Sequence, residues 1–273
     1  RIENAVAPFG YSIDYADESE VYGALLRPGY SICHMDEPVG GRMLTMRKVY
    51  HAPFWSIERK AKRHEYAVAQ ADFDPDAQDL EGAAGFVSRW RKRLFEGFDV
   101  GPSGHIYVPL QGILLKRRKI QATSPIDMLK AVLARSDGRK VIATTHPRET
   151  NSAAEKAALE KLAQTHSNLV LEAGQMERFL PGAAFVVAQN SGVAFNGYFF
   201  RKPAILFSPI DFHHIALNVR KLGIDGAFDQ VETHAPDYDT FIHWFWQRRA
   251  INAGHPTAEE KIIAALRRGG WEL

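Results

Sequence analysis

The chain has 273 residues, of which 45% are hydrophobic and 24% are charged, as in an ordinary globular protein. Its 34 lysines and arginines nearly balance 32 aspartates and glutamates, which argues against a dedicated nucleic-acid-binding protein. The single cysteine, Cys33, excludes an internal disulfide framework and a cysteine-based zinc site. No apolar run approaches the ~20 residues needed to span a bilayer, and no signal peptide opens the sequence. We therefore expect a cytoplasmic protein.

Residues 1–103 show little regular alternation of elements. Apolar stretches at 30–33 and 43–46 are typical of strands, and turns rich in proline and glycine separate them. A helix is predicted over 76–95, because Phe86, Trp90 and Leu94 recur at helical spacing. We expect this region to form an N-terminal α/β lobe.

The pattern becomes regular from Gly104 onward, where apolar strands alternate with helices. This alternation predicts right-handed βαβ units and a parallel sheet covered on both faces, so we interpret 104–240 as a Rossmann-like domain. Ser124, Pro125 and Asp127 form a typical helix start. Strands are predicted at 105–110, 140–145, 168–172, 184–189 and 203–207, and helices at 124–135, 152–164, 191–200 and 213–222.

The C-terminal segment, 241–273, is predicted to contribute closing helices. The first covers 238–252, where four apolar side chains recur at helical spacing, and the second covers 258–268. Thr257 and Glu260 have the spacing of a capping box for the second helix. The four apolar side chains of the first helix are Phe241, Trp244, Phe245 and Ile251.

Polar groups follow four of the predicted strands. Ligands bind beyond the carboxyl ends of the strands in an open parallel sheet, so these groups are expected to meet at one edge. Histidine can donate to a phosphate or act as an acid or base, and a serine at a helix start can face an anion. The candidate residues are Gln111, His146, Pro147, Asn190, Ser191 and Gly192, followed by Ser208, Asp211, His213 and His214.

Each candidate also has an ordinary structural explanation. Ser191 can be a simple N-cap, and His146 can be a histidine satisfied by its own backbone. We predict no metal site, because His213 and His214 are adjacent on a predicted helix and no matching carboxylate or cysteine accompanies them. The sequence contains no Walker motif, no dinucleotide-binding glycine motif and no nucleophile elbow, which disfavours ATP, NAD and α/β-hydrolase chemistry.

Three basic runs interrupt the otherwise balanced charge, at 59–63, 89–93 and 116–119. Such runs usually form solvated surfaces. The third, Lys116 to Lys119, follows a predicted strand in a loop, where it can meet anionic lipid headgroups or an anionic sugar.

An ordered set of motifs between Val108 and Leu273 resembles the bacterial capsule polysaccharide biosynthesis family, which includes Kdo transferases. The motifs are Val-Pro-Leu-Gln at 108–111, Ser-Pro-Ile-Asp-Met-Leu at 124–129, Thr-His-Pro at 145–147, Gln-Asn-Ser-Gly-Val at 189–193, Lys-Pro-Ala-Ile at 202–205 and Trp-Phe-Trp-Gln-Arg-Arg-Ala-Ile-Asn-Ala-Gly at 244–254. The matching part covers about 60% of the chain, and residues 1–100 resemble the family only vaguely.

The resemblance implies a glycosyltransferase of the two-lobed GT-B type, with two Rossmann-like lobes and C-terminal helices packing across the cleft. It implies a CMP-activated sugar donor, with Kdo as the expected sugar, and no metal or other cofactor. His146 and Pro147 are then expected to contact the cytidylate phosphate, and Ser191 with Asn190 to hold the phosphate or ribose. The N-terminal lobe becomes the acceptor side. The implied partners are a saccharide or glycolipid acceptor and, by peripheral contact, the inner membrane or other capsule-assembly proteins.

One departure from the family pattern concerns the catalytic acid. Related proteins commonly carry acidic residues after the strand-end glutamine, whereas residues 112–119 here contain no carboxylate. Asp36 and Glu37 are the substitute base candidates, although a turn before Pro38 is the simpler explanation of both. Two alternatives stay open: a glycosyltransferase that uses a UDP- or GDP-sugar, and a non-catalytic partner that binds nucleotide or glycan.

Overall fold

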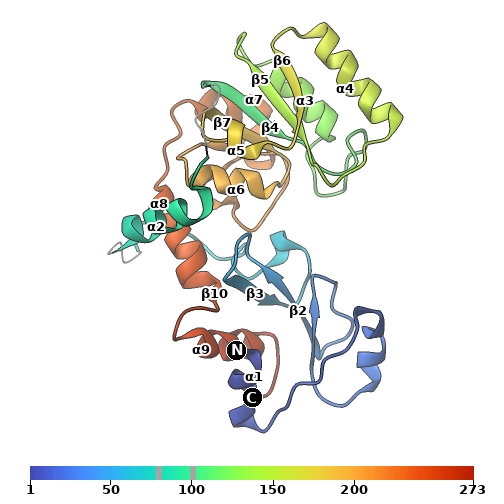
Figure 1. Cartoon of the computed structure of the whole chain (residues 1–273), viewed down its shortest axis with the longest axis vertical. Coiled ribbons are helices and arrows are strands. Elements are labelled where there is room, and N and C mark those ends of the chain that lie inside the picture. Colours follow the sequence, from blue (N-terminus) through green and yellow to red (C-terminus); the bar gives the residue numbers. More distant parts are fainter. Residues whose placement is uncertain (78–81, 99–102) are drawn as a thin grey trace. The chain divides into compact units, whose positions relative to one another are not determined.

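The structure, a computed structural model, describes residues 1–77, 82–98 and 103–273 and divides them into two compact units. The first unit contains residues 1–73 and 242–273, and the second contains residues 74–241 (Figure 1). The C-terminal segment thus joins the N-terminal unit. The boundary expected near Gly104 differs from this division, since the helix over 83–95 belongs to the second unit; Gly101 and Pro102 lie outside the described residues.

The second unit is built on a six-stranded parallel sheet of order β6-β5-β4-β7-β8-β9. If β4 is counted as strand 1, the strand order is 3-2-1-4-5-6, which is that of a doubly wound Rossmann sheet. The predicted α/β fold class is therefore confirmed. The near-continuous apolar runs of the sequence become its buried central strands. The strands are β4 (His105–Pro109), β5 (Val141–Thr145), β6 (Leu169–Ala173), β7 (Ala183–Ala188), β8 (Ala204–Leu206) and β9 (Leu217–Asn218).

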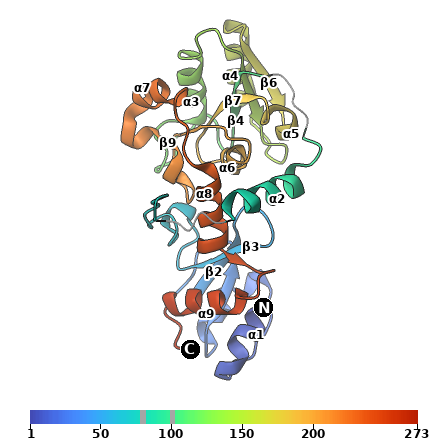
Figure 2. The ribbon, with the colours of Figure 1, turned by 90° about the vertical axis from the view of Figure 1, so that its left-hand side faces the viewer.

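Helices cover both faces of this sheet (Figures 1 and 2). One face packs on α3, α4 and α7 through alternate strand residues such as Val108 and Phe185. The intervening residues face the other way, where Tyr107 contacts Phe179 and Val186 lies against Gly197. The helices of this unit are α2 (Ala83–Phe95), α3 (Pro125–Leu133), α4 (Ala153–Thr165), α5 (Met176–Phe179), α6 (Gly192–Tyr198) and α7 (Val219–Val231).

The starts of α3 and α4 follow local chemistry. Ser124 caps α3 by accepting a hydrogen bond from the Asp127 N–H at 3.1 Å, as predicted. Ser152 and Glu155 form a reciprocal capping box at the start of α4. The helix predicted over 213–222 is wrong: His213–Ile215 is a 3-10 turn, β9 follows, and α7 begins only at Val219. A two-residue edge strand leaves too short an apolar pattern to detect.

The first unit contains a smaller, mixed sheet of order β1-β2-β3-β10. The β1–β2 pair is parallel, whereas β3 pairs antiparallel with both β2 and β10. Leu44 and Ile57 pack against Ile262 and Leu266 in the core of this unit. Its strands are β1 (Ser31–His34), β2 (Met43–Lys48), β3 (Phe54–Glu58) and β10 (Ile251–Asn252), and its helices α1 (Ile2–Val6) and α9 (Ala258–Arg268) lie side by side (Figure 2). Further 3-10 turns cover Ala7–Phe9, Glu18–Glu20, Gly23–Leu26 and Arg63–Glu65.

The C-terminal segment differs from the single helix predicted over 238–252. Helix α8 (Tyr238–His243) changes into a π-helix, Trp244–Arg249, before β10. Trp246, within this π-helix, lies in the core, although it is not among the four apolar residues named in the prediction. The capping box predicted at Thr257 is also wrong, because its hydroxyl pairs with His255 Nδ1 at 2.9 Å and caps nothing. Among the described helices, none has the length and apolar character needed to cross a bilayer.

Candidate functional site

The six-stranded sheet has its topological switch point between β4 and β7. The chain leaves β4 toward β5 on one side and later returns to β7 on the other, and in open α/β sheets ligands bind beyond the carboxyl ends of the strands at such a point. Gln111 follows β4, His146 follows β5 and Asn190 follows β7. Since neighbouring strands lie about 4.8 Å apart, the structure brings these predicted residues to one edge of the second unit.

His146 is held by its own turn. The Arg148 N–H donates to His146 Nδ1 at 3.2 Å, so this nitrogen is the acceptor of the ring. In the neutral imidazole the proton therefore sits on Nε2, which is left to donate to a ligand. Pro147 is exposed, and Gly174 approaches it without a side chain, since a Cβ there would lie 3.8 Å from Pro147. The turn thus presents a half-buried N–H donor at the end of β5.

Ser191 caps the start of α6. The residue is 2% exposed, and its Oγ accepts from the Val193 N–H at 3.3 Å. Because the hydroxyl uses a lone pair in this bond, its own proton is still available for donation. Asn190 and Gly192, on either side of Ser191, are half-buried. The predicted N-cap is therefore real, and it is compatible with a second role toward a ligand.

Two buried polar atoms beside these residues have no hydrogen-bond partner in the described part of the chain. They are Gln189 Oε1, at the end of β7, and Ser208 Oγ, beyond the end of β8. The backbone joins the two, because the Ser208 N–H donates to the Gln189 carbonyl at 3.0 Å. A buried polar atom left unpaired is costly, so both atoms mark a place where a ligand or water is expected.

A pocket of about 240 Å³ opens next to Ser208, toward β9 and α7. Its lining includes two cationic side chains, Arg220 and Lys221, and the amide-bearing Asn218. The rings of His213 and His214 stack with centroids 4.4 Å apart. Within residues 1–77, 82–98 and 103–273, no three histidine, cysteine or carboxylate side chains gather as a metal site would require.

The loop over 112–119 lacks an acid of its own but is held by two carboxylates from the segment after β5. Glu149 Oε2 accepts from the Gly112 N–H at 2.6 Å, and Glu155 Oε1 accepts from the Leu114 N–H at 2.5 Å. Glu149 is exposed and sits three residues after His146. The sequence of the loop does not reveal Glu149, because the contact joins residues 37 apart in the chain. Glu155, in contrast, was detectable from its Ser152-x-x-Glu155 pattern.

The hydrogen bonds of Glu155 predict that the stability of the fold depends on pH. Hydrogen bonds from Ser152 and from the Leu114 N–H hold the pKa of Glu155 below its ordinary value. A carboxyl with a depressed folded-state pKa stabilises the fold above its unfolded pKa of about 4.3, and this stabilisation is lost as the pH falls. We expect Glu155→Gln to lower the free energy of unfolding by about 1–2 kcal/mol at pH 7 and by less at pH 3. Urea unfolding at both pH values tests this, with the exposed Glu160→Gln as the control; equal losses at both pH values would contradict it.

Asp36 and Glu37 belong to the first unit, whereas the strand-end residues belong to the second. Asp36 is exposed after β1, and its backbone carbonyl accepts from Cys33 Sγ at 3.3 Å. Glu37 Oε2 accepts from the Ala61 N–H at 3.1 Å, and Glu37 Oε1 lies 3.9 Å from Lys60 Nζ. Glu37 therefore ties β1 to the segment after β3, as a turn-stabilising residue would.

Comparisons with known proteins identify the fold. No protein-family model and no curated protein matches the sequence. KpsC of Thermosulfurimonas dismutans, a β-Kdo 2,7-transferase, is similar with a TM-score of 0.55 and 10% identity, over 97% of this chain and 95% of that one. The UDP complex of S. aureus MnaA is similar with a TM-score of 0.37 and 14% identity, over 70% of this chain and 48% of that one. The UDP-GlcNAc 2-epimerase of Neisseria meningitidis is similar with a TM-score of 0.38 and 10% identity, over 69% of this chain and 50% of that one. This similarity shows the fold alone, and the GT-B-like α/β architecture implied by the family resemblance is thus confirmed.

Proposed function

We propose that the protein is a glycosyltransferase that transfers Kdo from a CMP-activated donor to a saccharide or glycolipid acceptor. The observation that carries this proposal is the hydrogen bond to His146 Nδ1, which leaves the Nε2–H donor at the switch point of the sheet without a hydrogen-bond partner among the described residues. The Ser191 hydroxyl and Gln111 lie at the same edge. Donors of this kind suit a phosphate, because hydrogen bonds to a charged group are stronger than those to a neutral one.

In this proposal the acceptor hydroxyl attacks the anomeric carbon of the donor, and the bond from that carbon to the phosphate oxygen breaks. The negative charge that develops on the departing cytidylate is stabilised by His146 and Ser191, without a metal ion. Pro147 fixes the turn that carries His146. In this proposal, Asn190 and Gly192 contact the ribose and phosphate of the donor nucleotide.

A base must take the proton from the acceptor hydroxyl. Asp36 and Glu37 are candidates on the first unit, and Glu149 is a candidate on the second. Glu149 uses only Oε2 in its bond to Gly112, while Oε1 has no hydrogen bond in the described part of the chain. Turnover by Glu149→Gln, Asp36→Asn and Glu37→Gln tests the three. The variant that loses turnover while keeping CMP affinity identifies the base.

The loop over 112–119 favours a peripheral membrane contact and thus a glycolipid acceptor. Ile113 is 56% exposed and Leu115 is 46% exposed, and the exposed basic run from Lys116 to Lys119 follows directly. Exposed apolar side chains beside several cations suit an anionic lipid surface. Contact with other capsule-assembly proteins is the alternative use of this loop.

Nucleotide binding tests the donor assignment. At a concentration of 100 times Kd, a ligand that binds only the folded state adds about 2.7 kcal/mol to the free energy of unfolding, which raises the Tm by several degrees. We expect this rise with CMP in a thermal-shift titration and little change with UDP or GDP. A rise with UDP or GDP alone would assign a different donor. CMP binding without turnover on any acceptor would favour the second candidate function, a non-catalytic partner, for which the acid-free loop is the supporting observation.

A further inference from the structure

The pocket next to Ser208 is lined by none of the residues assigned to the donor nucleotide. Its volume of about 240 Å³ lies below the ~300–1,000 Å³ of most ligand pockets, so it suits a small ligand. Its lining comes from the ends of β8 and β9 and from the start of α7. Because neighbouring strands lie about 4.8 Å apart, β8 and β9 stand about 14 and 19 Å from β5, the strand that precedes His146.

Only cations carry a charge among the described residues that line this pocket. Arg220 and Lys221 line it, both are exposed, and neither forms an ion pair within the described part of the chain. Asp225, the first acid of α7, pairs with Arg135 instead. Arg220 uses one of its five N–H groups, which donates to the Ile120 carbonyl at 3.4 Å. Both cations can therefore donate to an anionic ligand.

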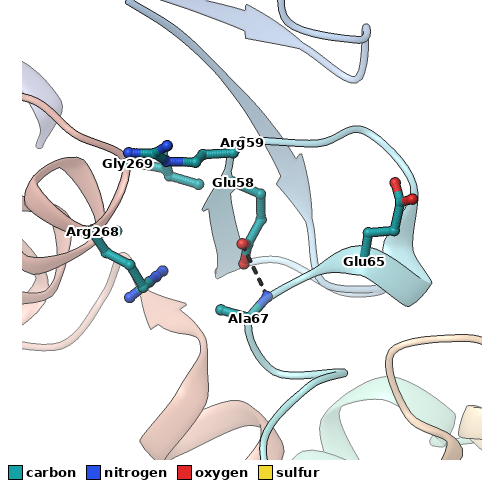
Figure 3. Close-up of a pocket in the computed structure, with 8 residues that line it drawn as sticks. Glu58, Arg59, Glu65, Ala67, Arg268 and Gly269 are labelled. Atoms are coloured by element: carbon teal, nitrogen blue, oxygen red, sulfur yellow. Dashed lines mark hydrogen bonds between the residues drawn. The ribbon is translucent and has the colours of Figure 1, made fainter. Parts of the chain in front are cut away.

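A pocket in the first unit, between β3 and α9, shows the opposite arrangement (Figure 3). There two glutamates, Glu58 and Glu65, line the same space of about 180 Å³ as two arginines, Arg59 and Arg268. An anion in that pocket would be repelled by the carboxylates. The pocket next to Ser208 has no such carboxylate among its described lining residues, so the charges around it attract an anion.

Ser208 contributes a buried hydroxyl to the pocket. The residue is 2% exposed, and its Oγ has no hydrogen-bond partner among the described residues. The backbone beside it is fixed, because the Phe207 N–H donates to the Ala188 carbonyl at 2.9 Å and the Ser208 N–H donates to the Gln189 carbonyl at 3.0 Å. An unpaired buried hydroxyl is costly, whereas an oxygen of a bound anion would accept its proton.

Asn218 contributes an acceptor to the same pocket. Its Nδ2 donates to the carbonyls of His213 and Ala216, at 3.0 Å each, so both amide hydrogens are used and Oδ1 is the group left for a ligand hydroxyl. Leu206 and Pro209 add apolar surface to the lining. The pocket thus offers donors to an anion, and an acceptor and apolar surface to the group that carries the anion.

We infer that this pocket binds the phosphate group of a small molecule, with Arg220, Lys221 and Ser208 Oγ donating to the phosphate oxygens. A phosphate group presents three strong acceptor oxygens and suits three separate donors, whereas a carboxylate has only two oxygens. Its source is free phosphate or a phosphomonoester such as a sugar phosphate. The CMP-activated donor has one phosphate, expected at His146 and Ser191, so this ligand is a second one. That separateness rests on the proposed function, whereas the phosphate chemistry does not.

The test measures binding of inorganic phosphate and of glucose 6-phosphate to the full chain by equilibrium dialysis, with and without saturating CMP. We expect phosphate binding in both conditions. Arg220→Gln and Lys221→Gln should each weaken it by at least about 5-fold, because each removes a charge-assisted hydrogen bond. Lys156→Gln, which changes an exposed lysine of α4 outside the pocket, should keep the wild-type affinity. The probe that binds more tightly identifies the source of the phosphate group.

Ser208→Ala separates ligand binding from a structural role. Since the hydroxyl has no partner among the described residues, its removal should leave the Tm unchanged and weaken phosphate binding by about 3-fold. A lower Tm with unchanged phosphate affinity would contradict the assignment, because the hydroxyl would then serve the fold alone.

Four other results would overturn the inference. These are no binding of either phosphate probe, unchanged affinity in both cation variants, equal affinity for glucose and glucose 6-phosphate, or displacement of phosphate by CMP. The Tm of each variant shows whether it is folded. Phosphate binding without CMP binding would remove only the proposed donor, and CMP binding without phosphate binding would remove only this site.

Discussion

Replacement of Trp246 by alanine is expected to lower the free energy of unfolding of the first unit by about 3–5 kcal/mol. Trp246 is fully buried, and its ring stacks on Phe54 with centroids 4.3 Å apart and an angle of 16° between the planes. His51 contacts the same ring edge-on at 5.8 Å. The truncation would leave a cavity beneath β3, at the point where the π-helix joins this unit. The lost aromatic contact adds to the cost of the cavity.

Urea unfolding followed by far-UV circular dichroism measures this loss without relying on tryptophan emission. Trp90→Ala makes the same chemical change on α2, where the side chain is only half-buried, and should cost clearly less. Trp246→Phe keeps an aromatic ring in the stack and should recover part of the loss. A loss below about 1 kcal/mol for Trp246→Ala would show that the C-terminal segment contributes little to the first unit.

His146→Ala is expected to weaken CMP binding by about 10-fold or more. The Nε2–H of this histidine would donate to a charged phosphate, a hydrogen bond worth ~1.5–3 kcal/mol, and each 1.4 kcal/mol corresponds to about 10-fold in affinity. Ser191→Ala should have a smaller effect, because the backbone N–H groups at the start of α6 survive the change. Titration calorimetry with CMP gives both affinities.

The matched control for His146→Ala is His166→Ala. His166 directly follows α4 and precedes β6, so it lies at the opposite edge of the same sheet. Its removal should leave CMP affinity unchanged. A His146→Ala protein that melts early yet binds CMP normally would make His146 a scaffold residue of the β5 turn, and the donor-site assignment would fail with it.

The second unit was largely predictable from the sequence, because its elements depend on local patterns. Apolar runs of five or six residues marked β4, β5 and β7, and Ser124 marked the start of α3. Once these strands are parallel and in Rossmann order, the groups that follow them must share one edge. Gln111, His146 and Ser191 could therefore be placed together before the structure was known.

The contacts of the loop over 112–119 were not predictable. Glu149 and Gly112 are 37 residues apart, and Glu155 and Leu114 are 41 apart. No local periodicity of the sequence predicts which carboxylate accepts a hydrogen bond from which backbone N–H when the two lie in segments that follow different strands. The tautomer of His146 was only partly predictable. The Arg148 N–H, which donates to His146 Nδ1, is only two residues away in the sequence, but the geometry of the turn decides whether this hydrogen bond forms.

The sequence by itself determined the α/β class of the fold, the strands β4 to β8 of the second unit, the starts of α3 and α4, and the residues that follow the carboxyl ends of its strands. Only the tertiary structure decided that the chain returns to the first unit, that Trp246 of the π-helix lies in its core, and that Arg59 and Arg268 line one pocket. The physical reason is the range of the interactions. Capping and alternation act between neighbours in sequence, whereas β3 pairs with β10 and packs on α9 across nearly 200 residues, where only the burial of shared apolar surface selects the partner.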